Sequence, residues 1–304
     1  MIPERIVRMR YHRLLNTFHQ LPEVEREYIT MRTKYYCKYN TPFSLPEDSP
    51  TLKNFSYKRR EAYRGINVSS VYFFDAYKYV RAFSHKYHWV YRPGDVNTIQ
   101  DVPSIVKSRP ISADNANRNN ILLKLNKVRH YIWVKDPISW EDKKSVILFR
   151  GDVNNKPSRK AFLKMWQHHP LCDLAARGDM SIYEHLKYKY IMALEGNDVA
   201  SNLKWLMSSN SIAVMPRPTC ETWFMEGKLI PDYHYIAISD DYHDLIERIT
   251  YYEEHPEEAK AIIHHAHEWV QQFQDEKREN LISIMVLQKY FKLSTTNRME
   301  DFSV

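Results

Sequence analysis

The stretch SVILFRGDVNNKPSR, residues 145–159, joins a short apolar run to a polar turn with a glycine and then to a helix start. The run Val146–Phe149 has the length of a buried strand, and Pro157 suits the first turn of a helix that we expect to reach His168. The same order recurs at residues 190–207, where an apolar run is followed by EGND and by leucines at helical spacing. Strands alternating with helices in this way predict parallel βαβ units, and therefore an α/β fold.

Other segments extend this alternation along the chain. Apolar runs predict further strands at His88–Tyr91, Tyr131–Val134, Ile212–Met215 and Tyr235–Ile238. Helical periodicity predicts helices at Val7–Gln20, Glu23–Tyr36, Asp114–Val128, Glu257–Phe273 and Glu276–Phe291. We place a boundary between two lobes in the polar stretch from Pro137 to Lys144. The first lobe is expected to cover residues 1–140 and the second 141–273, while residues 274–304 form a helix that packs back and a frayed tail.

Glycine is scarce in this chain and therefore informative. An average chain of this length would carry about 20 glycines at about 7% usage, whereas this one has 6. Scarce glycines tend to mark backbone positions that need them. Four of the six lie in short polar clusters, at Gly94, Gly151, Gly196 and Gly227. We therefore look for chemistry at these turns.

The charge and composition narrow the class of protein. The formal net charge of +7 favours anionic partners, which could be nucleic acid, a membrane surface or a phosphorylated substrate. Three widely spaced cysteines without a C-x-x-C pair indicate neither a disulfide framework nor a zinc site. No apolar run is long enough to span a bilayer, and the basic N-terminus lacks the apolar core of a secretory signal. We expect a cytoplasmic globular protein whose basic, aromatic N-terminal region could rest on an anionic membrane surface.

Two strand ends carry residues suited to phosphate. In open parallel sheets, ligands bind outside the carboxyl ends of the strands, where helix N-termini present free N–H groups. Arg150 and Gly151 end the first strand, and Arg159 in the next helix could reach a phosphate or could pack over a loop. After Gly196, a helix capped by Asn197 or Asp198 could direct its N–H groups to an anion, or could bind nothing. The motifs G-x-x-x-x-G-K-[ST] and G-x-G-x-x-G are both absent, which disfavours generic nucleotide hydrolysis and dinucleotide redox chemistry.

Acidic residues supply candidates for proton transfer. Asp95 follows Gly94 at a strand end, where it could be a general base or an ordinary turn aspartate. Glu221 could bind sugar or ribose hydroxyls, or cap a helix. The set Asp240, Asp241 and Asp244 resembles a metal-binding D-x-D, but it precedes an amphipathic helix and N-capping explains it better. We expect no metal there.

Three stretches together resemble a known family. Residues 189–236, KYIMALEGNDVASNLKWLMSSNSIAVMPRPTCETWFMEGKLIPDYHYI, resemble the signature of the CAP10-like glycosyltransferases, family 90. The stretches PSIVKSRPISADNANRNNILLKLNKVRHY, from residue 103, and SVILFRGDVNNKPSR are similar to the same family in the same order. The resemblance is strongest to the bacterial branch that modifies lipopolysaccharide core, and it covers roughly residues 87–273.

The resemblance implies a GT-B architecture, in which two Rossmann-like lobes face a cleft, with a helical N-terminal region and C-terminal helices. It implies inverting transfer of a hexose, glucose or galactose, from a UDP-sugar to a lipopolysaccharide or lipooligosaccharide core, without cofactor or essential metal. Asp95 matches the catalytic base. The donor-binding positions fall on Arg150, Gly151, Asp152 and Arg159 near the nucleotide, on Gly196, Asn197, Asp198, Val199, Ala200, Ser201 and Lys204 near the diphosphate, and on Glu221, Trp223 and Phe224 near the sugar.

One position departs from the family pattern. Eukaryotic relatives commonly carry Arg where this chain has Asn202, so we expect Lys204 or Arg159 to take more of the phosphate charge. The implied partners are a UDP-hexose, a lipopolysaccharide core acceptor and the cytoplasmic leaflet of the inner membrane. Two alternatives stay open: the same lobes acting on capsule polysaccharide or another acceptor, and a basic nucleic-acid-binding protein, for which no known signature is present.

Overall fold

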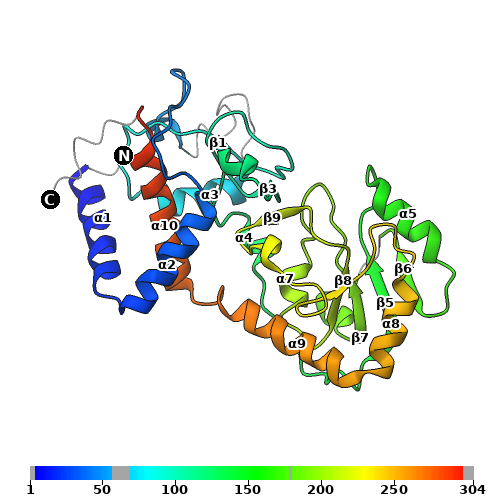
Figure 1. The fold of residues 1–304 in the computed structure, drawn as a ribbon. Helices are drawn as coiled ribbons and strands as arrows, with labels where there is room; N and C mark the ends of the chain where they lie inside the picture. Colours follow the sequence, from blue (N-terminus) through cyan, green and yellow to red (C-terminus); the bar gives the residue numbers. More distant parts are fainter. Residues whose placement is uncertain (1–3, 57–68, 178–179, 297–304) are drawn as a thin grey trace. The chain divides into compact units, whose positions relative to one another are not determined.

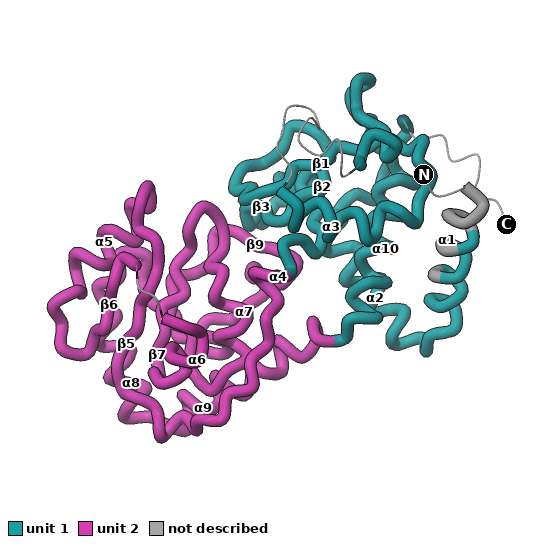
Figure 2. The backbone as a smooth tube through the Cα atoms, turned by 180° about the vertical axis from the view of Figure 1, so that it is seen from behind, with its two compact units in different colours: residues 1–127, 275–304 teal, residues 128–274 magenta. Residues whose placement is uncertain are grey.

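The computed structural model describes residues 4–56, 69–177 and 180–296. The chain forms two compact units, which Figure 2 distinguishes by colour. The first unit comprises residues 1–127 and 275–304, and the second comprises residues 128–274. The chain thus leaves the first unit, builds the whole second unit and then returns.

The first unit combines helices with a small parallel sheet. Its main helices are α1 (Glu4–His19), α2 (Glu23–Tyr36), α3 (Ser70–Val80) and α10 (Glu276–Leu293), with short 3₁₀ turns at Leu52–Asn54 and Ala116–Asn119. The sheet has the order β1-β2-β4, from Tyr91–Arg92, Ser104–Val106 and Asn120–Leu122, and β3 (Ser108–Pro110) follows β2. Helix α10 lies beside α2 and α3 (Figure 1), so the last helix of the chain covers elements from its beginning.

A buried charge cluster joins α10 to the rest of the first unit. The Glu279 carboxylate on α10 lies 3.1 Å from Arg32 on α2 and 3.2 Å from Lys124 after β4. Helix α10 otherwise buries an apolar face that includes Ile282 and Leu287. Hydrophobic burial therefore supplies the contact area, and the two ion pairs of Glu279 lie buried within it.

The second unit is built on a five-stranded parallel sheet. Its strands are β5 (Lys144–Arg150), β6 (Cys172–Ala175), β7 (Tyr188–Met192), β8 (Ile212–Met215) and β10 (Ile236–Ala237), in the order β10-β8-β7-β5-β6. Helices and short segments connect them, at α5 (Pro157–Trp166), α6 (Ile182–His185), α7 (Leu203–Leu206), β9 (Cys220–Thr222), a 3₁₀ turn (Glu226–Lys228), α8 (Leu245–Glu254) and α9 (Pro256–Gln271). Strand β5 comes first in the chain but has β6 on one side and β7 on the other, so the winding reverses there. This is a doubly wound α/β unit, and the predicted α/β class is confirmed.

Two predicted elements are wrong. The helix expected from Asp114 to Val128 is instead a 3₁₀ turn followed by β4, and the fully buried Ile121 and Leu122 belong to that strand. Asn126, with φ +55°, then turns the chain in the left-handed conformation that asparagine tolerates. The strand expected at Tyr131–Val134 is irregular chain. The other predicted strands and helices are present, although β10 is only two residues long and β1, Tyr91–Arg92, shares only Tyr91 with the predicted strand His88–Tyr91.

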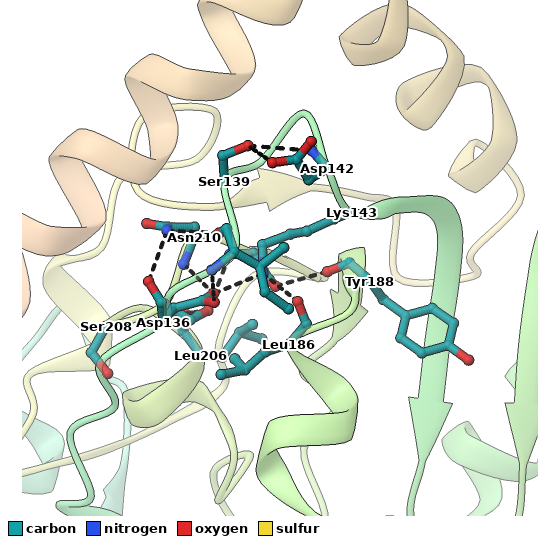
Figure 3. Close-up of polar contacts among 12 residues, drawn as sticks. Asp136, Ser139, Asp142, Lys143, Leu186, Tyr188, Leu206, Ser208 and Asn210 are labelled. Carbon is teal, nitrogen blue, oxygen red and sulfur yellow. Dashed lines mark hydrogen bonds and ion pairs between the residues drawn. The ribbon is translucent and has the colours of Figure 1, made fainter.

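The first unit ends at Lys127, whereas the sequence predicted a boundary after residue 140. Figure 3 shows why the intervening segment belongs with the second unit. Lys143 and Asp136 form an ion pair of 2.7 Å, with their side chains 0% and 2% exposed. The same Asp136 carboxylate accepts a 2.9 Å hydrogen bond from the backbone N–H of Asn210, before β8, and Lys143 donates to the carbonyl of Leu186, before β7. A stretch that looks polar in sequence is thus anchored to the large sheet.

No helix in the described residues is long and apolar enough to cross a bilayer.

Candidate functional site

A pocket of about 320 Å³ lies at the carboxyl edge of the large sheet. Its walls come mainly from the segments that follow β7 and β8, with contributions from α5 and from the chain after β10. The lining residues are Ser158, Ala193, Leu194, Glu195, Gly196, Val199, Ala200, Leu203, Met215, Pro216, Arg217, Pro218, Thr219, Glu226, Asp240 and Tyr242. Both its position and its size are those of a ligand site in a doubly wound sheet.

Arg159 fills the place where the winding of the sheet reverses. From the first turns of α5 its guanidinium donates to the carbonyl of Asp152, after β5, and to the carbonyls of Leu194 and Glu195, after β7. These three bonds measure 2.6 to 2.9 Å. Burial lowers the pKa of this guanidinium. Arg159 therefore ties together the ends of β5 and β7, and three of its five N–H donors bond to backbone carbonyls.

Two of the scarce glycines lie against that same guanidinium. A Cβ atom on Gly196 would lie 3.2 Å from a terminal nitrogen of Arg159, and one on Gly151 would lie 2.9 Å from the ring of Phe149 and 3.5 Å from Arg159. Neither glycine has a positive φ. They are needed for close packing around Arg159 rather than for backbone conformation.

Lys204 is fully buried and paired with Glu226. The Lys204 side chain on α7 is 0% exposed, and its ammonium donates to the Glu226 carboxylate, which is 1% exposed. Glu226 also accepts from the backbone N–H and hydroxyl of Thr222. Glu226 lines the pocket, whereas Lys204 does not. The Lys204–Glu226 pair has no net charge, so Lys204 does not make the pocket more positive.

Arg150 and Asp152 lie at the end of β5, outside the pocket lining. The Arg150 guanidinium forms an ion pair of 2.6 Å with Asp173 on the neighbouring strand β6, and it also donates to the carbonyls of Phe149 and Asp173. Asp152 accepts from the backbone N–H of Asn154. Arg150 is thus directed toward β6 rather than toward the pocket.

The loop after β7 reaches the pocket through its backbone and small side chains. Gly196, Val199 and Ala200 line the pocket, and Ser201, partly exposed, follows them. The predicted cap by Asn197 or Asp198 is wrong, because α7 begins at Leu203 and has Asn202 at its N-cap. Asn197 instead accepts a hydrogen bond from Lys156, and the carbonyl of Asp198 accepts from the N–H of Gly196 at 2.9 Å. The loop closes on itself before the helix starts.

Three further predicted residues are buried in the second unit. Glu221 lies in β9 with 3% of its surface exposed, and Trp223 and Phe224 are fully buried. The ring of Phe224 packs 4.8 Å from that of Phe273. None of the three lines the pocket. Their predicted contact with the donor sugar stays a prediction.

Several pocket residues have no strong signal in the sequence. Glu195 accepts hydrogen bonds from the backbone N–H groups of Thr219 and Cys220, at 3.1 Å each, and burial raises the pKa of its carboxyl. Arg217 and Thr219 follow β8 directly. Their place after a predicted strand, in MPRPT, is the one feature that could have drawn attention to them.

Asp95 lies in the first unit, at the carboxyl edge of the small sheet. It follows β1 and Gly94, whose φ of +104° requires glycine. Its carboxylate forms an ion pair of 2.5 Å with Lys107, which follows β2 and is 2% exposed in its side chain. The backbone N–H of Val96 donates to the hydroxyl of Ser108 at 3.0 Å. Asp95 is therefore held by its ion pair with Lys107, and its side chain is still 26% exposed to solvent.

The aspartates before α8 do not form the predicted caps. Asp244 occupies the N-cap position without a side-chain cap bond and accepts from Ser239 instead, while Asp241 bonds to His243. Within the described residues, no group of three or more His, Cys, Asp or Glu side chains could hold a metal ion.

The second unit belongs to the class of doubly wound α/β proteins that bind ligands outside the carboxyl ends of their strands. Residues 122–301 match the family described as glycosyl transferase family 90. The chain belongs to this family and is a glycosyltransferase, as the sequence resemblance predicted. The family assignment favours the enzyme over the nucleic-acid-binding protein that the net charge left open.

Among similar proteins, the O-glucosyltransferase LpsA of Dichelobacter nodosus is 39% identical over 290 residues, which cover 92% of this chain and 87% of that protein. Protein O-glucosyltransferase 2 of Danio rerio is 32% identical over 83 residues, covering 27% of this chain and 16% of that protein. Protein O-glucosyltransferase 3 of Rattus norvegicus is 25% identical over 177 residues, covering 53% and 34%. The similarity to the bacterial enzyme therefore extends over most of both chains.

Proposed function

We propose that this enzyme transfers glucose from UDP-glucose to a hydroxyl of a lipopolysaccharide core, with inversion at the anomeric carbon. The observation that carries this proposal is 39% identity to an O-glucosyltransferase named LpsA over most of both chains. The pocket at the edge of the large sheet supports it, since this is where doubly wound units bind nucleotides. We further propose that the enzyme works in the cytoplasm, peripherally on the inner membrane, where such acceptors are assembled.

The proposed reaction has one base and one leaving group. The Asp95 carboxylate takes the proton of the acceptor hydroxyl as its oxygen forms a bond to the anomeric carbon. The bond from that carbon to the phosphate oxygen breaks, and UDP departs with the electron pair. Lys107 positions Asp95 for this step through their ion pair. This scheme assigns the two units to the two lobes of a GT-B enzyme, one supplying the base and the other the donor pocket.

The substitution Asp95→Asn tests the base directly. It keeps the size of the side chain but removes the proton acceptor, so we expect transfer to fall by about 100- to 10,000-fold, the usual contribution of a general base. Donor binding should change little, because Asp95 is not part of the donor pocket. Transfer to purified core glycolipid is measured with radiolabelled UDP-glucose, and UDP binding by calorimetry.

Asp101→Asn is the matched control, since Asp101 is an exposed aspartate in the same unit. It should leave transfer unchanged. An Asp95→Asn enzyme that retains normal transfer contradicts the assignment of the base.

Activity with UDP-galactose in place of UDP-glucose, or with capsule polysaccharide in place of core, contradicts the proposed substrates but not the class of enzyme. Transfer that survives EDTA supports the metal-independent mechanism that the family resemblance implies, and transfer lost to EDTA contradicts it.

A further inference from the structure

A bound UDP-sugar brings a diphosphate into the pocket, and this charge needs a cation or oriented N–H groups to balance it. The sequence predicted that Arg159 or Lys204 supplies the cation. Arg159 instead donates to three backbone carbonyls, and Lys204 is buried in an ion pair with Glu226. Arg150 is likewise committed to Asp173. Each of these three cations therefore has a structural role, in contacts with carbonyls or carboxylates of the protein itself.

Arg217 is in a different situation. Of the described residues that line the pocket, it is the one Lys or Arg, and its side chain is exposed. Among the described residues it forms no hydrogen bond or ion pair, so all five guanidinium N–H donors have no protein acceptor. An arginine in this condition can bind a phosphate in bidentate fashion.

The backbone around Arg217 is rigid. Pro216 and Pro218 flank it directly, and both line the pocket. Each proline fixes its own φ, and Pro218 also restricts Arg217 to extended conformations. The segment Pro216–Pro218 follows directly after Met215, the last residue of β8, so its start is anchored in the sheet. A rigid base reduces the entropy that the side chain loses when it binds a ligand.

The remaining charges of the pocket permit an anion near Arg217. The Glu226 carboxylate is neutralised by Lys204. The Glu195 carboxylate is already engaged by the N–H groups of Thr219 and Cys220. Asp240 is exposed to solvent, which screens its charge.

We propose that Arg217 is the side chain that binds the diphosphate of the sugar-nucleotide donor and stabilises it as the leaving group. This inference rests on the proposed function, since it assumes that the pocket holds the donor. It replaces the predicted roles of Arg159 and Lys204 with a structural one, and it makes the segment Pro216–Pro218 the phosphate-binding part of the pocket.

The test compares UDP with uridine, which lacks the phosphates. Both are titrated into the full chain and into Arg217→Ala and Arg217→Lys at fixed ionic strength, with binding followed by ligand-observed NMR. We expect Arg217→Ala to weaken UDP binding by about 10- to 100-fold, the range for a charge-assisted hydrogen bond. Uridine binding should change by less than about 2-fold. Arg217→Lys should show an intermediate loss for UDP, because an ammonium keeps the charge but not the bidentate geometry.

Lys164→Ala is the control, since Lys164 is an exposed cation in the same unit and does not line the pocket. It should leave UDP affinity unchanged. Three outcomes overturn the inference. Equal UDP affinity in Arg217→Ala and in the unaltered protein would show that Arg217 does not bind the diphosphate. An equal loss of affinity for UDP and uridine would show that Arg217 only shapes the pocket. If the unaltered protein binds neither ligand, the proposed function fails together with the inference.

Discussion

Arg159 lies where a cation could bind a phosphate, but its guanidinium forms hydrogen bonds to backbone carbonyls instead. Its three carbonyl contacts hold the ends of β5 and β7 at a fixed spacing, and Gly151 and Gly196 leave room for it. The pocket borders this arrangement, since Gly196 and Leu194 belong to both. At the residue scale, the shape of the pocket therefore depends on an arginine that does not line it.

Gly196→Ala tests this dependence. The added Cβ would lie 3.2 Å from the Arg159 guanidinium, which must then shift, so we expect a loss of about 1–3 kcal/mol in the free energy of unfolding, typical of overpacking. Urea denaturation measures it. In the Arg159→Met background the clash is relieved, and the same Gly196→Ala change should cost clearly less. Equal costs in both backgrounds would show that the glycine is not needed for Arg159.

The sequence located these glycines but not their purpose. Their scarcity pointed to Gly151 and Gly196, and the structure places both at the edge of the large sheet. The partner of a side chain is not visible in sequence, because Arg159 meets residues 35 and 36 positions away only after the sheet has formed. The same holds for the pairing of Lys204 with Glu226. Arg217 was missed because an arginine between prolines fits no phosphate motif.

At the scale of elements, the segment from Asp136 to Lys143 acts as a buried anchor. It precedes β5 and bonds to the chain before β7 and before β8 (Figure 3). Three strands of the large sheet are thus joined at their starts by one ion pair. Both side chains are almost completely buried, so removing one charge would leave the other buried without a partner.

Lys143→Met should destabilise the protein strongly. The Asp136 carboxylate would stay buried without its cation, at an expected cost of about 3–5 kcal/mol in the free energy of unfolding. The double change Lys143→Met with Asp136→Asn removes the isolated charge and should recover part of this loss. As a control, Lys78→Met breaks a surface pair with Glu276 and should have little effect. Thermal or urea unfolding separates these cases, and similar losses for the two lysines would contradict the proposed anchor.

Long elements with clear periodicity were predictable, and short ones were not. The strand at β5 and the helices at α2, α9 and α10 follow directly from apolar spacing. The segment from Asp114 to Val128 carries apolar residues at helical spacing too, yet Ile121 and Leu122 pair with β2 in a parallel strand. Pairing with β2, a strand elsewhere in the sequence, makes this segment a strand, and the spacing of its own apolar residues cannot predict that pairing.

At the scale of the whole molecule, the two units differ in how the chain builds them. The second unit is continuous, from Val128 to Gln274, and holds its own core and the entire pocket. The first unit is made of two pieces and needs α10 from the end of the chain. Charge contacts such as those of Glu279 join the two pieces.

A fragment of residues 128–274 should therefore fold by itself. We expect cooperative unfolding by circular dichroism and, under the proposed function, UDP affinity within about 3-fold of the full chain, with no sugar transfer because Asp95 is missing. Residues 1–127 alone should lack cooperative unfolding, since the faces of α2 and α3 that α10 covers would be exposed. A fragment of residues 128–274 that is unfolded, or that binds no UDP while the full chain does, would contradict this division.

The return of α10 to the first unit also orders events during translation. All of residues 128–274 leave the ribosome before the helix that completes the first unit has been made. At a synthesis rate of about 5–20 residues per second, the apolar faces of α2 and α3 stay uncovered for several seconds while residues 128–274 are made. Exposed apolar surface of this kind is prone to aggregation, so we expect a chaperone that covers α2 and α3 during synthesis to raise the yield of folded enzyme.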